Sequence, residues 1–449
     1  MKSSTLALAI AAGTLGLSLS NVANAAFFED SKAKLDLRNF YYDLNNKNTA
    51  NNDAEANEWG QGFIFNYTSG FTEGTVGVGV DVIGLYGVRL DGGGDSSTPR
   101  DRAPGQLFPT ETDGSAVSDY SKAGATAKLR LSKTELRLGT LLPKLPVVNF
   151  NDGRLLPQLF NGGQITSNEI DGLTLTAGQL ENTKTRSSTD NVGLRIGGAA
   201  RPTGSPTTAA IADTNKFYFA GGDYKLTKDL TAQYYYGNLE DFYKQHFLGL
   251  VHNWALPVGS LKSDLRYFDS GSDGKNGNAA GRAQGYRSAG EPGFNGEVDN
   301  QTWSALFTYS LSGHSLSAGY QQVSGDSAFP FLNQGDGSTA YLITDRQIGK
   351  FLSAGERTWL AEYGYDFASA GVPGLKATVT YLSGDNIEGG AAGDRKEWER
   401  DFRLDYTLQE GALKGLGFSW RNASLRSNVA TTTDADENRL IVSYSIPLL

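Results

Sequence analysis

Between residues 33 and 449 the chain consists largely of short stretches in which every second residue is apolar. In the clearest of these, 303–311 and 359–367, aromatic and aliphatic residues alternate mostly with serine, threonine, glycine and acidic residues. Because successive side chains of a strand point to opposite faces, such a stretch forms a strand with one apolar and one polar face. The pattern predicts an all-β protein, either a soluble sandwich that buries its apolar faces or a transmembrane barrel that turns them toward lipid.

The start of the chain favours the barrel. It has Lys2, an apolar stretch over 6–19 and the small-residue sequence Ala23-Asn24-Ala25, which together indicate a secretory signal peptide over residues 1–25, cleaved after Ala25. The apolar stretch is too short for a membrane-spanning helix, and no later stretch has the ~18 apolar residues that such a helix needs. We therefore expect an exported protein whose mature part, residues 26–449, crosses a membrane with strands.

The spacing of the alternating stretches predicts roughly 18 to 20 strands of about ten residues, the length of a tilted spanning strand. The connections alternate between short turns, such as 227–229 and 312–314, and long polar loops, such as 88–121 and 324–356. Short turns on one side and long loops on the other are typical of bacterial outer-membrane barrels. The sequence therefore predicts a closed antiparallel transmembrane β-barrel of about 18 strands, in which the first strand pairs with the last.

Composition narrows the possible chemistry. The chain has no cysteine, which excludes disulfides and thiol catalysis, and its three histidines are too scattered to suggest a metal cluster. It carries neither a nucleophile elbow nor a phosphate-binding glycine loop. The net charge of −9 lies mostly in loop-like segments, where it favours solubility at a charged outer surface. We expect no enzyme activity, no cofactor, no metal and no nucleic-acid partner.

If the apolar residues face lipid, their neighbours along each strand face the lumen. This places a set of basic residues inward, with acidic residues on the same faces; the basic residues are Arg38, Lys128, Arg130, Arg403, Arg421 and Arg439, and the acidic ones are Asp36, Asp401 and Asp405. The last three strands and the first are neighbours in a closed barrel, so their four arginines line one strip of wall. Such a strip can attract anions into a narrow passage, whereas the alternative is that the arginines pair with lumen acids and stiffen the wall.

One segment breaks the strand pattern. Residues 142–163 contain three prolines within fifteen residues, which excludes a central strand, yet the segment is too apolar for an exposed loop. We expect it to fold into the barrel, narrow the pore and present Arg154 near the constriction. The alternative is a cap on the outside of the barrel.

Six stretches that follow one another through the mature chain form a specific series: DLRNFYYD (36–43), QGFIFNYTSGFTEGTVGVGVD (61–81), GRLLPQ (153–158), LEDFYKQ (239–245), GVPGLKATVTYLSG (371–384) and RLIVSY (439–444). In these stretches the chain resembles the OprD family of substrate-specific outer-membrane channels of pseudomonads. The resemblance implies an eighteen-stranded barrel, an inward loop that shapes a narrow eyelet, and basic residues that guide carboxylates. It implies that the loop arginine is Arg154 and that Arg421, Arg439 and Arg38 belong to the basic series.

Two positions depart from the members that take up basic amino acids. The resemblance implies that those members have a further arginine at the position of Ser419. They tend to have an acid at the position of Arg403. The resemblance therefore implies passive uptake of small organic carboxylates, aromatic or related acids among them. The alternatives are a weakly selective porin, a basic amino acid or peptide channel of the same family, and, from another class, a barrel enzyme or adhesin. As partners we expect small carboxylates, outer-membrane lipid and lipopolysaccharide, with the protein a monomer or a weak homo-oligomer.

Overall fold

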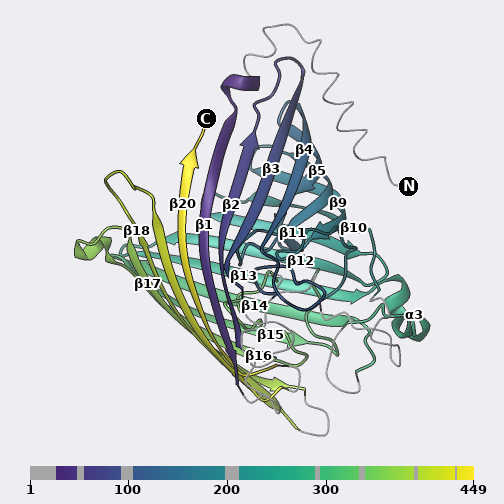
Figure 1. Ribbon diagram of the computed structural model, residues 1–449. Coiled ribbons are helices and arrows are strands. Elements are labelled where there is room, and N and C mark those ends of the chain that lie inside the picture. The colour runs from purple at the N-terminus through teal and green to yellow at the C-terminus, as the bar shows by residue number, and fades with distance from the viewer. Residues whose placement is uncertain are drawn as a thin grey trace.

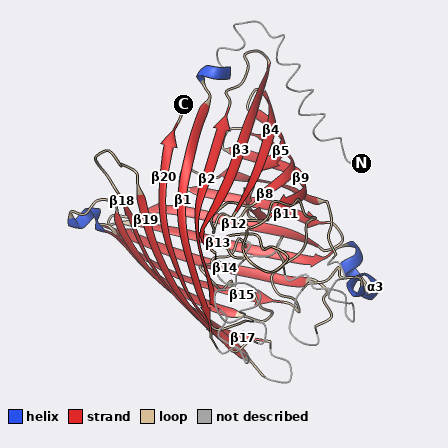
Figure 2. Ribbon diagram, in the orientation of Figure 1, coloured by secondary structure: helices blue, strands red, loops and turns tan. Residues whose placement is uncertain are grey.

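The computed structural model describes residues 27–47, 55–92, 105–197, 212–288, 294–332, 339–388, 393–429 and 432–449. The predicted signal peptide over residues 1–25 lies outside the described residues. Strands make up most of the molecule, and the short helices lie before the first strand or in the connections between strands (Figure 2). Among the described residues, no helix combines the length and the hydropathy that a membrane-spanning helix needs.

Eighteen strands form one antiparallel sheet (Figure 1). Their bounds are β1 Lys32–Asn46, β2 Glu55–Thr68, β3 Val76–Asp91, β4 Asp119–Leu131, β5 Thr134–Leu141, β8 Leu159–Ser167, β9 Leu173–Lys184, β10 Phe217–Lys225, β11 Leu230–Leu239, β12 Tyr243–Ala255, β13 Ser260–Ser272, β14 Asp299–Leu311, β15 His314–Ser324, β16 Arg357–Asp366, β17 Leu375–Ile387, β18 Arg395–Thr407, β19 Gly417–Ser427 and β20 Ala435–Pro447. A two-stranded hairpin, β6 Lys144–Leu145 and β7 Val148–Asn149, and the short helices η2 Gly274–Gly277, α3 Ala279–Ala283 and η3 Phe367–Ala370 lie in the connections.

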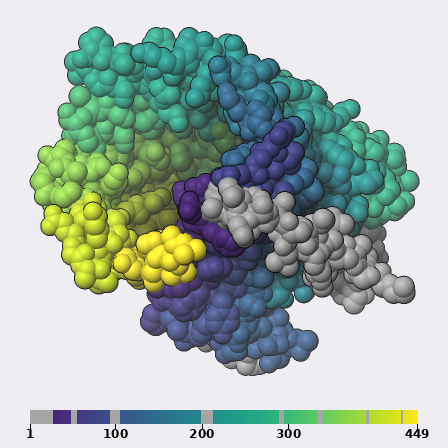
Figure 3. Space-filling model, turned by 90° about the horizontal axis from the view of Figure 1, so that it is seen from above, coloured from purple at the N-terminus to yellow at the C-terminus, as the bar shows by residue number. Residues whose placement is uncertain are grey.

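The sheet closes on itself, as predicted. β1 pairs with β20 in a register that runs from Lys34 opposite Pro447 to Asn46 opposite Ala435. Seen from the side of the chain ends, the purple β1 and the yellow C-terminal residues lie against each other (Figure 3). Closure gives every strand two neighbours, so no edge with unpaired backbone groups faces lipid.

The described connections alternate in length along the chain. Two-residue turns such as 132–133 and 312–313 lie at one end of the barrel, which we call the turn end. The described parts of the long connections, which include 105–118, 185–197, 273–288 and 339–356, begin or end at the other end of the strands, the loop end. In bacterial outer-membrane barrels the short turns face the periplasm and the long loops face the outside.

The apolar positions of the strands face outward. Trp303 and Trp359 are 42% and 65% exposed on the outer surface, whereas the adjacent Ser304 and Thr358 are 3% and 1% exposed. A soluble sandwich would have the opposite arrangement. The period-two pattern was therefore correctly assigned to an inside-out barrel.

The interior is less uniformly polar than the sequence suggested. On the side of β10–β13 the inward positions include Phe217, Phe219, Tyr235, Phe247 and Phe268, all nearly fully buried. Apolar residues of the long connections pack against them, and together they form a core inside the barrel; these residues are Val147, Val148, Leu194, Ile196, Phe329, Phe331, Leu332 and Leu342. The connections therefore fill this side of the barrel interior with apolar side chains.

The inside-out arrangement predicts that a charged residue on the outer surface destabilises the protein more when it lies nearer the middle of the bilayer. Leu265 lies opposite Ala305 at the middle of β14, while Leu311 lies at the turn end, and both are 38% exposed. We expect Leu265→Arg to lower the free energy of unfolding in lipid vesicles by ~2–4 kcal/mol and Leu311→Arg by only ~0–1 kcal/mol. Equal losses in urea titrations of the two variants would contradict the predicted position of the bilayer.

Candidate functional site

The proline-rich segment between β5 and β8 lies inside the barrel. β5 ends at Leu141 and β8 begins at Leu159, so the inward segment covers residues 142–158, with the β6–β7 hairpin in its first half. Residues 159–163, which the sequence analysis included in the loop, are instead the first residues of β8. The chain returns to the wall directly after Pro157, because beyond that residue the backbone N–H groups are available to pair with β5 and β9.

Two glycines of β2 allow the segment to lie directly on the wall. Leu155 and Leu156 are fully buried against it. A Cβ atom on Gly60 would lie 2.8 Å from Leu155 Cδ2, and one on Gly62 would lie 3.1 Å from the Leu155 carbonyl oxygen. Any larger residue at these positions would therefore push the segment toward the centre of the lumen.

Two inward cations hold the backbone of this segment. Arg38 on β1 donates to both carboxylate oxygens of Asp152, at 2.7 and 3.1 Å, and to the carbonyl oxygen of Arg154 at 2.7 Å. The Lys122 ammonium on β4 donates to three carbonyl oxygens at 2.8–2.9 Å, those of Pro157, Thr185 and Arg186. Arg38 therefore positions the inward segment. This role adds to its predicted position among the arginines that line one strip of the wall.

At the tip of the segment, Arg154 meets the wall formed by β1 and β20. Its guanidinium carbon lies 4.5 Å from the centre of the Tyr42 ring, and Nη2 lies 3.9 Å from Glu437 Oε2. Tyr42 donates to the same Glu437 oxygen at 2.8 Å, and Arg439 Nε pairs with Glu437 Oε1 at 2.5 Å. Glu437 thus lies between two arginines, and all four side chains are buried.

A second inward segment, residues 339–352, reaches the same place from the connection between β15 and β16. Gln347 donates to Glu437 Oε1 at 3.0 Å, and its carbonyl oxygen accepts from Arg439 at 2.8 Å. We call Tyr42, Arg154, Gln347, Glu437 and Arg439 the constriction cluster, because both inward segments meet the wall there.

A buried acid of β18 anchors this second segment. The Glu399 carboxylate accepts from the backbone N–H groups of Gln347, Ile348 and Gly349 at 2.5–3.1 Å. Within the segment, burial raises the pKa of the Asp345 carboxyl, and Lys350, 3.3 Å away, opposes that shift. Three backbone donors on one carboxylate hold the segment firmly on the wall.

Three of the predicted arginines stand side by side on adjacent strands. Arg403 on β18 lies directly opposite Arg421 on β19, and Arg421 lies directly opposite Arg439 on β20. We call Arg403, Arg421 and Arg439 the arginine row. Directly opposite side chains on one face of an antiparallel pair lie ~4.5–5.5 Å apart at Cβ, and like charges at this spacing are destabilising.

The members of the row differ in how their charge is balanced. Arg439 is buried and paired with Glu437, whereas Arg403 pairs with Asp405 at 2.5 Å and leaves 49% of its side chain exposed. Arg421 donates to Ser419 Oγ at 3.2 Å, and the described residues contain no ion pair that involves it. The positive charge available to the lumen therefore lies on Arg421 and Arg403.

The remaining predicted residues lie apart from the row. Lys128 is almost fully buried, pairs with Asp81 at 2.7 Å and lies over the ring of Phe71, which Arg130 also contacts at 4.2 Å. Asp36 pairs with Lys34 near the turn end, and Asp401 lies on the same face of β18 as Arg403, next to the anchoring acid Glu399. The structure does not place Lys128 and Arg130 beside the constriction cluster.

Some residues of the site were not found from the sequence. Glu437 and Tyr42 lie two and four residues from Arg439 and Arg38, so the same period-two argument could have placed them on the inner face. Gln347 and the anchoring role of Glu399 had no such signal, because they depend on how a long connection folds back into the barrel.

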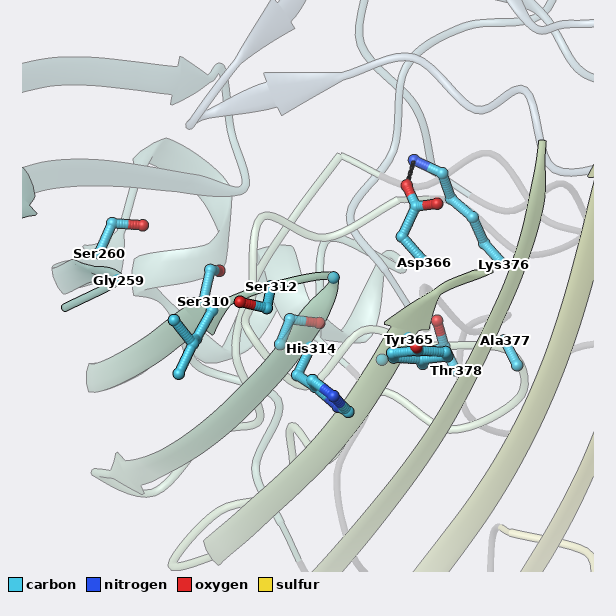
Figure 4. Close-up of a pocket in the computed structure, with 14 residues that line it drawn as sticks. Gly259, Ser260, Ser310, Ser312, His314, Tyr365, Asp366, Lys376, Ala377 and Thr378 are labelled. Carbon is cyan, nitrogen blue, oxygen red and sulfur yellow. Dashed lines mark ion pairs between the residues drawn. The ribbon is translucent and has the colours of Figure 1, made fainter. Parts of the chain in front are cut away.

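A hollow of about 590 Å³ lies at the turn end of β13–β17. Its lining is mainly small and polar and includes the Asp366–Lys376 ion pair at 3.0 Å (Figure 4). Thr378, one of the lining residues, lies directly opposite Arg403. The hollow therefore adjoins one end of the arginine row. Across the described residues, no group of three or more potential ligands suitable for a metal ion occurs.

The chain is similar to known porins over nearly its whole length. Residues 25–448 match the model of a family described as outer membrane porin, OprD family. Porin-like protein GalP of Pseudomonas putida is 36% identical, with 94% of this chain and 93% of that protein covered, and Porin D of Pseudomonas aeruginosa is 34% identical, with 100% and 99% covered.

Solved structures agree with this. Pseudomonas aeruginosa OccK8 (OprE) is 59% identical, with a TM-score of 0.85, and the match covers 95% of this chain and 100% of that one. Pseudomonas aeruginosa OpdK, crystallised with vanillate, is 35% identical, with a TM-score of 0.80 and coverage of 94% and 100%.

The contacts of Arg38 predict that it narrows the pore. We expect Arg38→Met to release Asp152 and the backbone of the inward segment, and so to increase single-channel conductance in planar bilayers. Lys34→Met removes an inward charge from the same strand without touching the segment, and should leave conductance close to that of the unaltered protein. A decrease in conductance with Arg38→Met would contradict the tethering role.

The position of Glu437 between two arginines predicts a second effect. Glu437→Gln should shift the reversal potential in a salt gradient toward greater anion preference, because Arg154 and Arg439 lose their shared counter-charge. It should also lower the free energy of unfolding by ~3–5 kcal/mol, the usual cost of breaking a buried ion pair. Glu135→Gln, which removes an acid from the inner face of β5, is the control, and selectivity changes of the same size in both variants would exclude a special role for Glu437.

Proposed function

The chain belongs to the OprD family of outer-membrane porins, and we propose that it is a substrate-specific channel for the passive uptake of small organic carboxylates along Arg421 and Arg403. The observation that carries this proposal is the arginine row. Three guanidinium groups directly opposite one another raise the free energy of the folded protein, and only two of them have a carboxylate partner among the described residues. An anion beside Arg421 relieves this repulsion.

Guanidinium groups suit a carboxylate in particular. Each can form two parallel hydrogen bonds to one carboxylate, so neighbouring arginines can pass it from one to the next without complete loss of contact. Low-dielectric walls concentrate the field of the exposed cations and so raise the local concentration of anions. Asp405, which pairs with Arg403, competes with the substrate there and thus favours its release toward the turn end.

The proposed route has an order along the barrel axis. The two inward segments limit the size of the entering molecule at the constriction cluster, where Glu437 offsets part of the charge of Arg154 and Arg439. The substrate then meets Arg421, moves to Arg403 and leaves through the hollow at the turn end, which faces the periplasm in this class of barrel. Vanillate, in the structure of the relative OpdK, is an aromatic carboxylate, which supports acids of this kind as substrates.

Arg421→Gln tests the proposal in proteoliposomes. We expect about a tenfold slower uptake of benzoate and a lower anion-to-cation permeability ratio, since a hydrogen bond to a charged group contributes about 1.5–3 kcal/mol. Uptake of a neutral sugar of similar size should change little.

Arg137→Gln is the matched control, because Arg137 is an inward arginine on β5, outside the row and paired with Glu135. It should leave benzoate uptake near its original rate. Equal passage of benzoate and the neutral sugar through the unaltered protein would instead support a weakly selective porin.

A further inference from the structure

The outer surface carries a basic patch of its own, at the loop end of β18 and β19. Lys396, Trp398 and Arg400 occupy alternate positions of β18 and share its outward face, and Arg426 on β19 lies directly opposite Trp398. Three cations therefore surround one tryptophan, which we call the β18 patch. None of these side chains belongs to the lumen, because the inward positions between them are Glu397 and Glu399.

The patch lies at the level of an aromatic belt. Outward aromatic rings contact one another from β14 to β16, with centroids 5.3 Å apart for Trp303 and Tyr320 and 4.6 Å for Tyr320 and Trp359. On β17 and β18, Tyr381 and Trp398 stack at 6.1 Å, and Arg400 lies directly opposite Tyr381. Tryptophan and tyrosine belts mark the level of the lipid headgroups, so the cations of the patch lie where headgroup phosphates lie.

Two of the three cations keep their charge uncompensated. Arg426 pairs with Asp436 at 2.8 Å and lies 6.0 Å from the Trp398 ring centre. Arg400 instead donates to two neutral acceptors, Asn422 Oδ1 at 3.0 Å and Ser424 Oγ at 3.1 Å, which orient its guanidinium group.

Within the described residues, neither Lys396 nor Arg400 forms an ion pair. The nearby acid of β17, Asp385, lies directly opposite another cation, Arg357.

Further along the same belt, on β13 and β14, the outward positions carry the reverse charge. Beyond Tyr267 on β13 and Trp303 on β14, the outward positions carry Asp269, Gln301 and Asp299. An anionic headgroup would be repelled there and attracted to the β18 patch. A general need for solubility does not explain this difference in charge, since both regions lie at the same level of the outer surface.

We propose that the β18 patch binds the phosphorylated sugar headgroup of an outer-leaflet glycolipid such as lipopolysaccharide. Lys396 and Arg400 contact phosphate, and Trp398 packs on the face of a sugar ring. Arg426 holds Trp398 and adds positive charge. This inference does not depend on what the pore transports.

The test measures lipid binding to the full-length barrel in detergent by native mass spectrometry, with bis-phosphorylated lipid A as the probe. We expect Lys396→Gln and Arg400→Gln each to weaken binding about fivefold and the double variant about 25-fold, because a cation near a membrane surface contributes ~1 kcal/mol to the attraction of anionic lipid. Lys244→Gln removes a single exposed outward cation at the loop end of β12 and should leave binding unchanged. Single-channel conductance should be the same in all variants, which also verifies that the barrel is folded.

Three outcomes would overturn the proposal. Equal binding of dephosphorylated lipid A would exclude phosphate recognition. Displacement of lipid A by millimolar inorganic phosphate would point to a free-anion site and not to a lipid headgroup. Equal weakening by Lys244→Gln would show that the attraction depends on overall charge and not on the patch.

Discussion

The need to pair every backbone N–H and C=O group inside a bilayer governs this molecule. Eighteen strands meet that need only by closing, and closure brings β1 and β20 together although they lie at opposite ends of the chain. Once the sheet is closed, each strand has one face toward lipid and one toward the interior, and the alternation of residues decides what each face meets. The outward aromatic residues and the inward arginines are consequences of the same constraint.

The interior combines two uses of charge that differ in exposure. At the constriction cluster, Glu437 is the shared counter-charge of Arg154 and Arg439 in a buried, hydrogen-bonded arrangement that joins both inward segments to the wall. Arg421 and Arg403 belong to the same face but keep charge available to water and solutes. The sequence allowed two roles for the lumen arginines, structural pairing and attraction of anions. The first applies to Arg439 and the second to Arg421 and Arg403.

Packing against the inward segments explains why the lumen is narrower than an eighteen-stranded wall would suggest. Apolar inward residues such as Phe217 and Phe247 form a core with the connections, so part of the barrel interior resembles that of a soluble protein. The inward faces of β18, β19 and β20 instead carry the arginine row. Whether an inward side chain packs in the core or faces the lumen therefore depends on the strand that carries it.

The sequence by itself determined the strand type, the approximate strand number, the closure and the inward direction of Arg38, Arg403, Arg421 and Arg439. These follow from a period of two, which depends only on neighbouring residues and on the contrast between lipid and water. Prolines between residues 142 and 158 also marked a segment that could not pair in the sheet. Only the tertiary structure decided which arginines are neutralised, that Lys128 and Arg130 lie apart from the row, and that Gln347 and Glu399 bring a second segment to the constriction. Such contacts join residues far apart in the sequence through loops whose path is set by three-dimensional packing, and no local pattern encodes that path.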